Sequence, residues 1–371
     1  MRGGYGGGHW TPAEPVGGLA GQRAGAGPAG TRGARMTEQP VDTSPPPRRR
    51  LGELEVSAVG YGAMVLMGLY GDTTDRDAAD VVRRALDSGV TFLDTADAYG
   101  ADGLSERRLA PAVAGRRDDV QLATKWGIAT DPSGPARRRP DTKWDNEVLV
   151  DARPERARAA LEGSLTRLGV DHVDLWYLHW TDPGVPVEDS VGAMAELVAE
   201  GKARHLGICN ATADELRRAH ATHPMAALQS EWSLWTRGIE DEVLPLAREL
   251  GVGIVPWAPL GSGFLTGTVA QVADGDFRRH HPRFQGDNLR RNQERFAPLA
   301  DLAARKGVTM AQLALAWLLH QGPDVVPIPG TRNPDRIAEN AAAASVALSD
   351  DDVHRIEEIA APGTAVGAAL L

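Results

Sequence analysis

Four polar side chains stand at, or just after, the ends of strand-like runs in this sequence. Apolar runs end in Asp94 ("VTFLD"), Lys125 ("VQLATK") and His179 ("DLWYLH"), and Tyr99 follows Asp94 by five residues. Taken alone, each is more often a cap, a solvated cation or a satisfied core residue. Because the carboxyl ends of parallel strands in a barrel converge on one pocket, the set together predicts a site of chemistry.

The four residue types suit proton donation to a carbonyl oxygen. A phenol with a pKa near ~10 donates poorly at neutral pH unless a nearby positive charge stabilises the phenolate. Lys125 can supply that charge, and Asp94 offers the counter-ion that a buried lysine needs. A neutral His179 can orient the same oxygen through a hydrogen bond. Asp97, in contrast, is expected to form a turn or to lie solvated in the loop.

Strand-like runs alternate with amphipathic helical stretches from Arg50 onward. Continuous apolar runs are typical of parallel strands that are buried on both faces. Eight such runs favour an α/β fold of the (β/α)8 TIM barrel type over an open doubly wound sheet. The runs are Ala58–Tyr61, Val90–Leu93, Val120–Ala123, Val173–Leu178, His205–Ile208, Ala226–Leu228, Gly253–Pro256 and Val325–Ile328.

The segments outside this alternation have recognisable compositions. "RRLGELEVSAVG" predicts an N-terminal β-hairpin at the bottom of the barrel, and residues 127–152 and 258–295 are long loops at its C-terminal face, either walls of a pocket or mobile surface. Residues 1–48, rich in Gly, Ala, Pro and Arg, are expected to be a disordered extension, with Met36 a hypothetical physiological start. The barrel is assigned to residues 49–360 and a C-terminal tail to 361–371.

Composition excludes several classes of protein. The 371 residues carry a net charge of -10, which argues against a nucleic-acid binder, and no apolar run reaches the ~20 residues that span a bilayer. A single cysteine, Cys209, excludes an intrachain disulfide and a cysteine-built metal centre, so the reducing cytoplasm is the expected compartment. His280 and His281 lack a third ligand, and no metal site is predicted. A small-molecule partner remains, and the oligomeric state is not indicated.

Known nucleotide and hydrolase motifs are missing. "GYGAMVLMG" lacks the third glycine and the acidic residue of a Rossmann fingerprint, and no P-loop, GxSxG elbow or HExxH helix occurs. Seven motifs instead resemble, in order and spacing, those of aldo-keto reductases: "FLDTADAYG", "ATKWG", "DLWYLHW", "GICNAT", "LQSEWSLW", "PWAPLGSGFLTG" and "IPGTRNPDRIAEN". The resemblance covers about residues 50–359, and is greatest to bacterial and plant NADPH-dependent reductases with a "GTR" signature.

The resemblance implies that aldehydes or ketones are reduced to alcohols with NADPH. Tyr99 would be the general acid, Lys125 would lower its pKa, Asp94 would pair with Lys125, and His179 would orient the carbonyl. The alternative is an NADP(H)-binding regulatory or redox-sensor subunit on the same fold, although a sensor needs no intact tetrad. A barrel isomerase or lyase without nicotinamide is disfavoured by the cofactor motifs.

The resemblance also implies a cofactor site across the barrel mouth. Asn210 and Gln229 would hold the nicotinamide carboxamide together with Cys209, a weaker donor than the family's usual serine. Arg332 and Arg336 would pair with a 2'-phosphate, which favours NADP(H) over NAD(H). The whole implied set comprises Gly62, Ala63, Met64, Asp94, Cys209, Asn210, Gln229, Trp257, Ala258, Pro259, Leu260, Ser262, Gly263, Leu265, Gly330, Thr331, Arg332, Arg336, Glu339 and Asn340.

Two of these positions depart from, or extend, the pattern. Gly330 stands where the best-known family members have a lysine, so the preference for NADPH is expected to be looser than theirs. Trp257 stands in the place of the aromatic residue that stacks on the nicotinamide. Trp126 and Trp180, each directly after a tetrad residue, either line the substrate pocket or pack in the core.

Overall fold

The computed structural model describes residues 47–369, apart from residues 70, 131–135, 140–147 and 274–275. Most of the extension predicted to be disordered, residues 1–46, therefore lies outside the described residues, as do the last two residues of the tail. Arg48, which that prediction included in the extension, begins the first strand.

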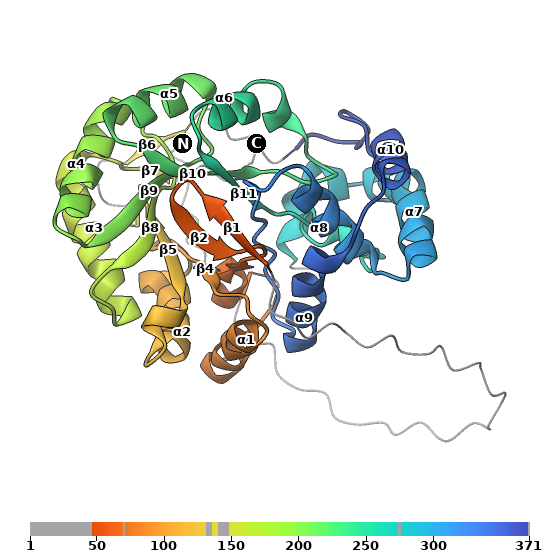
Figure 1. Ribbon diagram of the computed structural model, residues 1–371, viewed down its shortest axis with the longest axis horizontal. Coiled ribbons are helices and arrows are strands. Elements are labelled where there is room, and N and C mark those ends of the chain that lie inside the picture. The colour runs from red at the N-terminus through yellow and green to blue at the C-terminus, as the bar shows by residue number, and fades with distance from the viewer. Residues whose placement is uncertain (1–46, 70, 131–135, 140–147, 274–275, 370–371) are drawn as a thin grey trace, which may run out of the picture. The chain divides into compact units, whose positions relative to one another are not determined.

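A parallel sheet of seven strands forms the centre of the fold, in the order β11-β10-β9-β8-β5-β4-β3 (Figure 1). Neighbours in this order are neighbours in the chain, apart from the small β6–β7 hairpin (Arg137–Arg138 and Leu149–Val150), which is the pattern of a singly wound barrel. The strands are β3 (Tyr61–Gly62), β4 (Phe92–Asp94), β5 (Gln121–Trp126), β8 (Val173–Leu178), β9 (Ala203–Cys209), β10 (Met225–Glu231) and β11 (Gly253–Trp257).

Residues 324–329 close the barrel between β11 and β3. The Val326 N–H donates to Ile254 O at 2.8 Å, and the Gly60 N–H donates to Pro327 O at 2.9 Å on the other side. Pro327 and Pro329 have no N–H to donate toward β3, so this ladder is half formed and the segment is not a regular strand. The predicted eighth strand nevertheless occupies its expected place, and the (β/α)8 barrel is confirmed.

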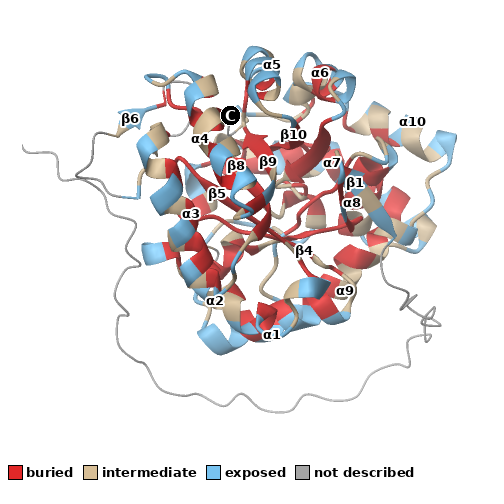
Figure 2. Ribbon diagram, turned by 60° about the vertical axis from the view of Figure 1, so that its left-hand side comes forward, coloured by how far each residue is buried: buried red, intermediate tan, exposed pale blue. Residues whose placement is uncertain are grey.

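Most of the helices cover the outside of the sheet, with their buried faces turned toward it (Figure 2). Capping boxes start four of them, with Thr74, Thr212, Thr309 and Ser349 as the caps. The helices are α1 (Asp75–Asp87), α2 (Leu104–Val113), α3 (Pro154–Leu168), α4 (Val187–Ala199), α5 (Ala213–Thr222), α6 (Val243–Glu249), α7 (Asn288–Lys306), α8 (Met310–His320), α9 (Pro334–Ala342) and α10 (Asp350–Ile359). No helix among the described residues is long and apolar enough to cross a membrane.

Side chains alternate between the inside and the outside of the barrel along each strand. On β5, Ala123 belongs to the inner apolar cluster, and Trp126 belongs to the outer cluster between the strands and the helices. Lys125 shares the inward face with Ala123, and Thr124 shares the outward face with Trp126. This alternation separates the residues that reach the barrel interior from those that reach the helices.

An antiparallel hairpin, β1 (Arg48–Leu51) and β2 (Leu54–Ser57), closes the bottom of the barrel. Leu51 is fully buried and belongs to the inner cluster with Val255. A Cβ at Gly253, the first residue of β11, would lie 2.5 Å from Leu51 Cα, so only glycine fits beneath the hairpin. The N-terminal hairpin is where the sequence predicted it.

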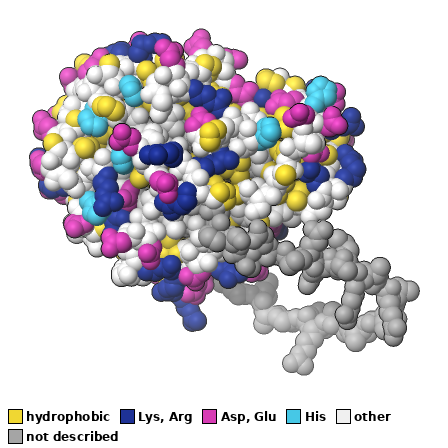
Figure 3. Space-filling view, viewed as in Figure 1, with side chains coloured by type: hydrophobic (Ala, Val, Ile, Leu, Met, Phe, Trp, Pro, Cys, Tyr) yellow, Lys and Arg dark blue, Asp and Glu magenta, His cyan; other side chains and the backbone are white. Residues whose placement is uncertain are grey.

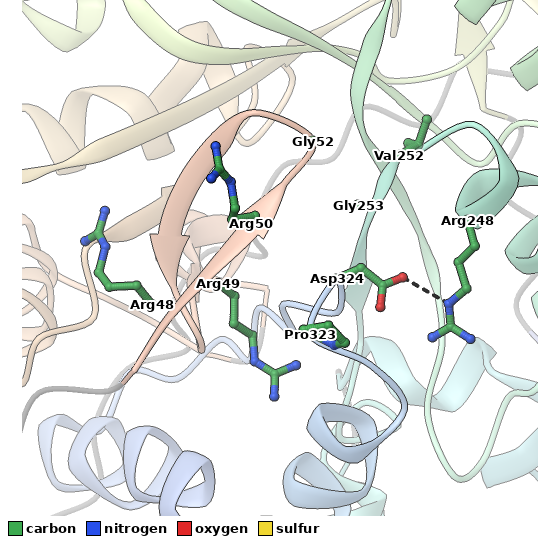
Figure 4. Close-up of a pocket in the computed structure, with 10 residues that line it drawn as sticks. Arg48, Arg49, Arg50, Gly52, Arg248, Val252, Gly253, Pro323 and Asp324 are labelled. Atoms are coloured by element: carbon green, nitrogen blue, oxygen red, sulfur yellow. Dashed lines mark hydrogen bonds and ion pairs between the residues drawn. The ribbon is translucent and has the colours of Figure 1, made fainter.

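A cavity of about 520 Å³ lies beside this hairpin and is lined by several arginines (Figure 4). The Arg49 guanidinium donates to Leu319 O at 2.8 Å and Val325 O at 2.9 Å, and Arg248 pairs with Asp324 at 3.0 Å. The arginine side chains drawn in Figure 4 point apart and do not converge on one point. Basic and acidic side chains are interspersed over the face that Figure 3 shows. The hydrogen bonds of Arg49 and the ion pair of Arg248 therefore indicate a structural role for the arginines around the cavity.

Both long loops are packed where they are described. In the loop that follows β11, Phe264 stacks on Trp235 with ring centroids 4.2 Å apart, and Phe284 meets the same indole edge-on at 5.1 Å. In the loop that follows β5, Arg137 pairs with Asp182 at 3.2 Å. The tail past α10 is also anchored, because the Val366 N–H donates to Asn292 Oδ1 on α7 at 2.7 Å.

Candidate active site

The structure brings the four strand-end residues together at the mouth of the barrel. Lys125 Nζ contacts Asp94 Oδ1, and it donates to Thr95 O at 2.9 Å and to the Tyr99 hydroxyl at 3.3 Å. Asp94 and Lys125 are almost fully buried, with 2 % and 0 % exposure. The His179 ring lies edge-on to the Tyr99 ring with centroids 5.5 Å apart. One ammonium thus lies between a carboxylate and a phenol, with an imidazole alongside.

Backbone hydrogen bonds fix the loop that carries Tyr99. The Asp97 N–H donates to Lys125 O at 3.2 Å, and the Tyr99 N–H donates to Ala96 O at 3.3 Å, which forms a turn. The His179 N–H extends the β5 ladder by donating to Trp126 O at 2.8 Å. Tyr99 and His179 therefore lie on short extensions of the sheet, and the rigid barrel sets their positions.

Burial and the ammonium determine which groups carry protons. Burial raises the pKa of Tyr99 to about 12, although Lys125 pulls it down. Burial works to lower the pKa of Lys125, but the neighbouring Asp94 more than offsets it and the net shift is upward. Burial and Lys125 together lower the pKa of His179 well below 6.5. At neutral pH the site holds an ammonium, a protonated phenol and a neutral imidazole.

The residues predicted to hold the nicotinamide are joined to this site. Gln229 Nε2 donates to Asp94 Oδ2 at 2.8 Å, so both Asp94 oxygens have partners. Trp257 Nε1 donates to Asn210 Oδ1 at 2.9 Å. Asn210 adopts a left-handed backbone with φ 53°, a conformation that asparagine tolerates better than most residues. Its side chain is consequently fixed between Trp257 and the end of β8.

Cys209 is buried at the end of β9, with 1 % exposure, and belongs to the inner cluster. Burial raises the pKa of its thiol far above the ordinary value, against the pull of Lys125. The thiol is therefore neutral and can offer only the weak S–H donor expected from the sequence.

The predicted cofactor loop after β11 has an unusual backbone. Ala258 and Ser262 have positive φ values of 47° and 52°, and Gly261 packs so closely on the Trp235 ring that a Cβ would lie 2.6 Å from it. Arg278 Nη1 donates to Ser262 O at 3.3 Å. Left-handed non-glycine residues cost energy, so packing against Trp235 and Arg278 must stabilise this shape. Pro259, Leu260, Gly263 and Leu265 lie in the same loop.

Two glycines of the predicted cofactor set meet at the seam of the barrel. A Cβ at Gly62 would lie 2.7 Å from Ile328 O, and one at Gly330 would lie 2.6 Å from Gly62 O. A side chain at position 330 has no room on this backbone, so a lysine there would require the seam to shift. The Tyr61 hydroxyl also donates across the seam to Thr331 O, at 2.9 Å. Ala63 and Met64 follow in the turn 63–67.

The residues predicted to hold the 2'-phosphate lie before and within α9. Arg332 Nη1 donates to Asp72 O at 2.7 Å, and Arg336 pairs with Glu339 at 2.7 Å. Glu339 also accepts from Thr309 Oγ1 at 2.7 Å, and Asn340 is buried. The N-terminus of α9 adds a favourable dipole for an anion beside these guanidinium groups. These features fit an adenosine phosphate.

The two tryptophans differ in their surroundings. Trp126 is 1 % exposed, and its ring stacks on Trp176 at 5.5 Å in the layer between strands and helices. Of the two interpretations given above, its surroundings are those of core packing. The Trp180 ring lies 5.5 Å from the Arg139 guanidinium, which comes from the long loop after β5. Trp180 thus lies where that loop meets the end of β8.

Sequence reasoning missed a buried polar layer behind the tetrad. Asp97 lies in the turn between Ala96 and Tyr99, as one of its two expectations had it, but it is 8 % exposed, so the other expectation, a solvated loop residue, is wrong. Burial and nearby Glu106 raise the pKa of Asp97 to about 8, against the pull of Arg167. Glu106 is fully buried on α2. Glu106 and the preceding Ser105 lie in the first turn of α2. The sequence gives little indication that they are buried, because the same residue types occur at most exposed helix starts.

The barrel and the four residues at its mouth define a class of oxidoreductase built on the (β/α)8 fold. The model of the Aldo/keto reductase family matches residues 58–361, and the chain belongs to that family. Among the described residues no cluster suits a metal ion. The family uses NADP(H), and the chain is an NADP-dependent oxidoreductase.

Known proteins agree with this assignment. The chain is 44 % identical over 317 residues to "Probable aldo-keto reductase 1" of Glycine max, and the matched region covers 84 % of this chain and 88 % of that protein. A glycerol dehydrogenase of Gluconobacter oxydans superposes with a TM-score of 0.73 at 28 % identity, covering 84 % of this chain and 94 % of its own. An aldo-keto reductase of Klebsiella pneumoniae in complex with NADPH gives 0.64 at 28 %, covering 85 % and 96 %.

Proposed function

We propose that this chain reduces an aldehyde or ketone to an alcohol with NADPH, and that Tyr99 is the proton donor. The observation that carries the proposal is the buried ammonium of Lys125, which lies between Asp94 and the Tyr99 hydroxyl, 3.3 Å from the latter. Nothing in barrel packing requires a fully buried cation at this point, and its cost is offset by the Asp94 carboxylate, the Tyr99 hydroxyl and the Thr95 carbonyl oxygen.

The proposal gives each side chain one task. Tyr99 holds the proton that the carbonyl oxygen takes, and Lys125 stabilises the phenolate left behind. Asp94 keeps the lysine charged and in place. The His179 ring, neutral because burial and Lys125 lower its pKa, can donate to the same oxygen without adding a charge. NADPH, when bound, supplies the hydride that the carbonyl carbon receives, and it becomes NADP⁺ as the carbonyl is reduced.

The buried polar groups fit such a cofactor and substrate. His179 Nδ1 is buried without a hydrogen-bond partner in the described part of the chain. Trp257 presents a partly exposed ring beside Asn210, which suits stacking on a flat ring. Trp180, held against Arg139, is the proposed wall of the substrate pocket.

The substitution Tyr99→Phe tests the mechanism, because it removes the hydroxyl and keeps the ring. Steady-state NADPH oxidation with a panel of aromatic aldehydes, dicarbonyls and sugars should fall at least about 100-fold. The quenching of NADPH fluorescence on binding should remain. Turnover at the wild-type rate in Tyr99→Phe would refute the assignment. A wild-type protein that binds NADPH but oxidises it with none of these substrates would favour a regulatory subunit.

A further inference from the structure

Thr95 and Thr124, the neighbours of Asp94 and Lys125 in sequence, point away from the barrel interior and toward the first turn of α2. Strand alternation turns Asp94 and Lys125 into the barrel, and it turns Thr95 and Thr124 outward to the helical layer. Both threonines are fully buried, so their hydroxyls need partners inside the protein. Both partners come from one helix.

Ser105, the second residue of α2, is the hydrogen-bond partner of Thr95. Thr95 Oγ1 donates to Ser105 Oγ at 2.9 Å, and Ser105 Oγ donates in turn to Ala63 O at 2.8 Å. The Ser105 N–H donates to Tyr99 O at 3.0 Å. This one residue therefore connects the neighbour of Asp94, the backbone of Tyr99 and the turn after β3.

Glu106, the next residue, is the hydrogen-bond partner of Thr124. Thr124 Oγ1 donates to Glu106 Oε1 at 2.6 Å, and Arg167 Nε on α3 donates to Glu106 Oε2 at 2.5 Å. A Cβ at Gly103 would lie 2.4 Å from Arg167 Nε, so the glycine leaves the space through which Arg167 reaches the carboxylate. The carboxylate is fixed by a charged partner on one side and holds β5 on the other.

We propose that Ser105 and Glu106 are positioning residues, which hold Asp94, Tyr99 and Lys125 in register from behind the sheet. Neither touches the reacting atoms. Their hydrogen bonds connect the residue after Asp94 and the residue before Lys125 to one turn of α2, and they hold the loop that presents Tyr99. The inference rests on the proposed function, because only a reaction that needs this geometry makes its loss measurable as a rate.

Threonine variants give the most direct test. Thr124→Val keeps the shape but removes the hydroxyl, and Thr124→Ser keeps the hydroxyl. Because small misplacements of reacting groups cost up to about 100-fold in rate, we expect Thr124→Val, Ser105→Ala and Glu106→Gln each to lower kcat by about tenfold or more. The NADPH dissociation constant should stay within about twofold, and Thr124→Ser should restore most of the rate.

A matched control separates positioning from stability. Ser190 on α4 is 1 % exposed and donates to Ala152 O at 2.6 Å, so Ser190→Ala loses a comparable buried hydrogen bond away from the tetrad. It should leave kcat unchanged. If Ser105→Ala and Thr124→Val are folded and turn over as fast as Ser190→Ala, the inference is overturned, and so it is if Thr124→Ser is as slow as Thr124→Val.

A second measurement does not depend on turnover. Titration of Tyr99 by NMR of [¹³C-ζ]tyrosine reports how closely Lys125 approaches the phenol. We expect the phenol in Thr124→Val and Glu106→Gln to hold its proton to a higher pH than in Ser190→Ala. An unchanged Tyr99 titration in both variants would contradict the inference even if the protein proved not to reduce carbonyls. Absence of carbonyl reduction with a shifted titration would contradict only the proposed function.

Discussion

Gln229 donates to Asp94 Oδ2 at 2.8 Å across 135 residues of sequence, so the amide expected at the cofactor also orients the carboxylate beside Lys125. The contact joins β10 to β4, which lie apart in the barrel order. In the proposed mechanism, cofactor binding and proton donation are thereby connected through one buried side chain.

This contact predicts the behaviour of Gln229→Leu. A hydrogen bond to a charged group contributes roughly 1.5–3 kcal/mol, so the single-turnover rate at saturating NADPH should fall about 10- to 100-fold. Ser230→Ala is the control, because Ser230 is buried but faces the helices. If Gln229→Leu weakens only NADPH binding and keeps the saturated rate, the contact with Asp94 has no catalytic role.

Arg332 and Arg336 are predicted to distinguish the two nicotinamide cofactors. The double variant Arg332→Ala, Arg336→Ala should raise the NADPH dissociation constant at least about tenfold, because charge-assisted contacts to a phosphate are lost. The NADH constant should change by less than about twofold. Fluorescence titration measures both, with Arg355→Ala on α10 as the control. Equal weakening for the two cofactors would show that these arginines do not bind the 2'-phosphate.

Cys209→Ser is predicted to tighten NADPH binding by about two- to tenfold, because a hydroxyl donates a stronger hydrogen bond than the neutral, buried thiol. Cys209→Ala should leave the affinity unchanged if the thiol makes no contact with the carboxamide. Isothermal titration calorimetry of the three proteins checks this. Weaker binding by the serine variant would place the carboxamide elsewhere.

Asp97 predicts a pH dependence of stability. The folded protein holds this proton up to a pKa of about 8, whereas an ordinary aspartate releases it near 3.8. The folded state therefore binds more protons between these values, and the contribution of Asp97 to stability falls as the pH rises from about 4 to 8. Burial is the largest cause of the raised pKa of Asp97; Glu106 raises it further, and Arg167 and Arg156 act against the shift.

Asp97→Asn should flatten that slope and raise Tm at pH 8 by a few degrees, at roughly 2–4 °C per kcal/mol. Thermal unfolding at pH 5 and pH 8 measures the effect. Asp102→Asn, at an exposed position where φ is 50° and asparagine fits, is the control. A slope identical to that of the wild type would mean that another group titrates.

Much of the fold was predictable because parallel strands leave a strong signal. The run Val173–Leu178 matches β8 residue for residue, and the other runs overlap their strands or lie within about two residues of them. The eighth strand is the instructive exception: its position is as predicted, but Pro327 and Pro329 deprive it of a regular ladder. The packing of the loop after β11 depends on Trp235, which is too far away in sequence for any local pattern to reveal.

The tetrad was predictable for a related reason, since strand ends converge by geometry. What lies behind it was not. Asp97 and Glu106 are polar residues of a loop and a helix start, and sequence alone gives no measure of their burial. Trp126 shows that adjacency in sequence does not place a residue in the pocket. It follows Lys125 directly, but alternation along β5 turns it outward.

The alternation along β4 and β5 has a consequence for protein engineering. Thr95 and Thr124 never meet substrate or cofactor in the proposed mechanism, yet each is covalently bonded to a residue that does the chemistry. Libraries meant to improve the rate usually vary the residues that line the pocket. In this barrel the outward-facing neighbours on the helical side are equally good positions for randomisation, because we expect a change there to alter the geometry of the active site without altering its composition.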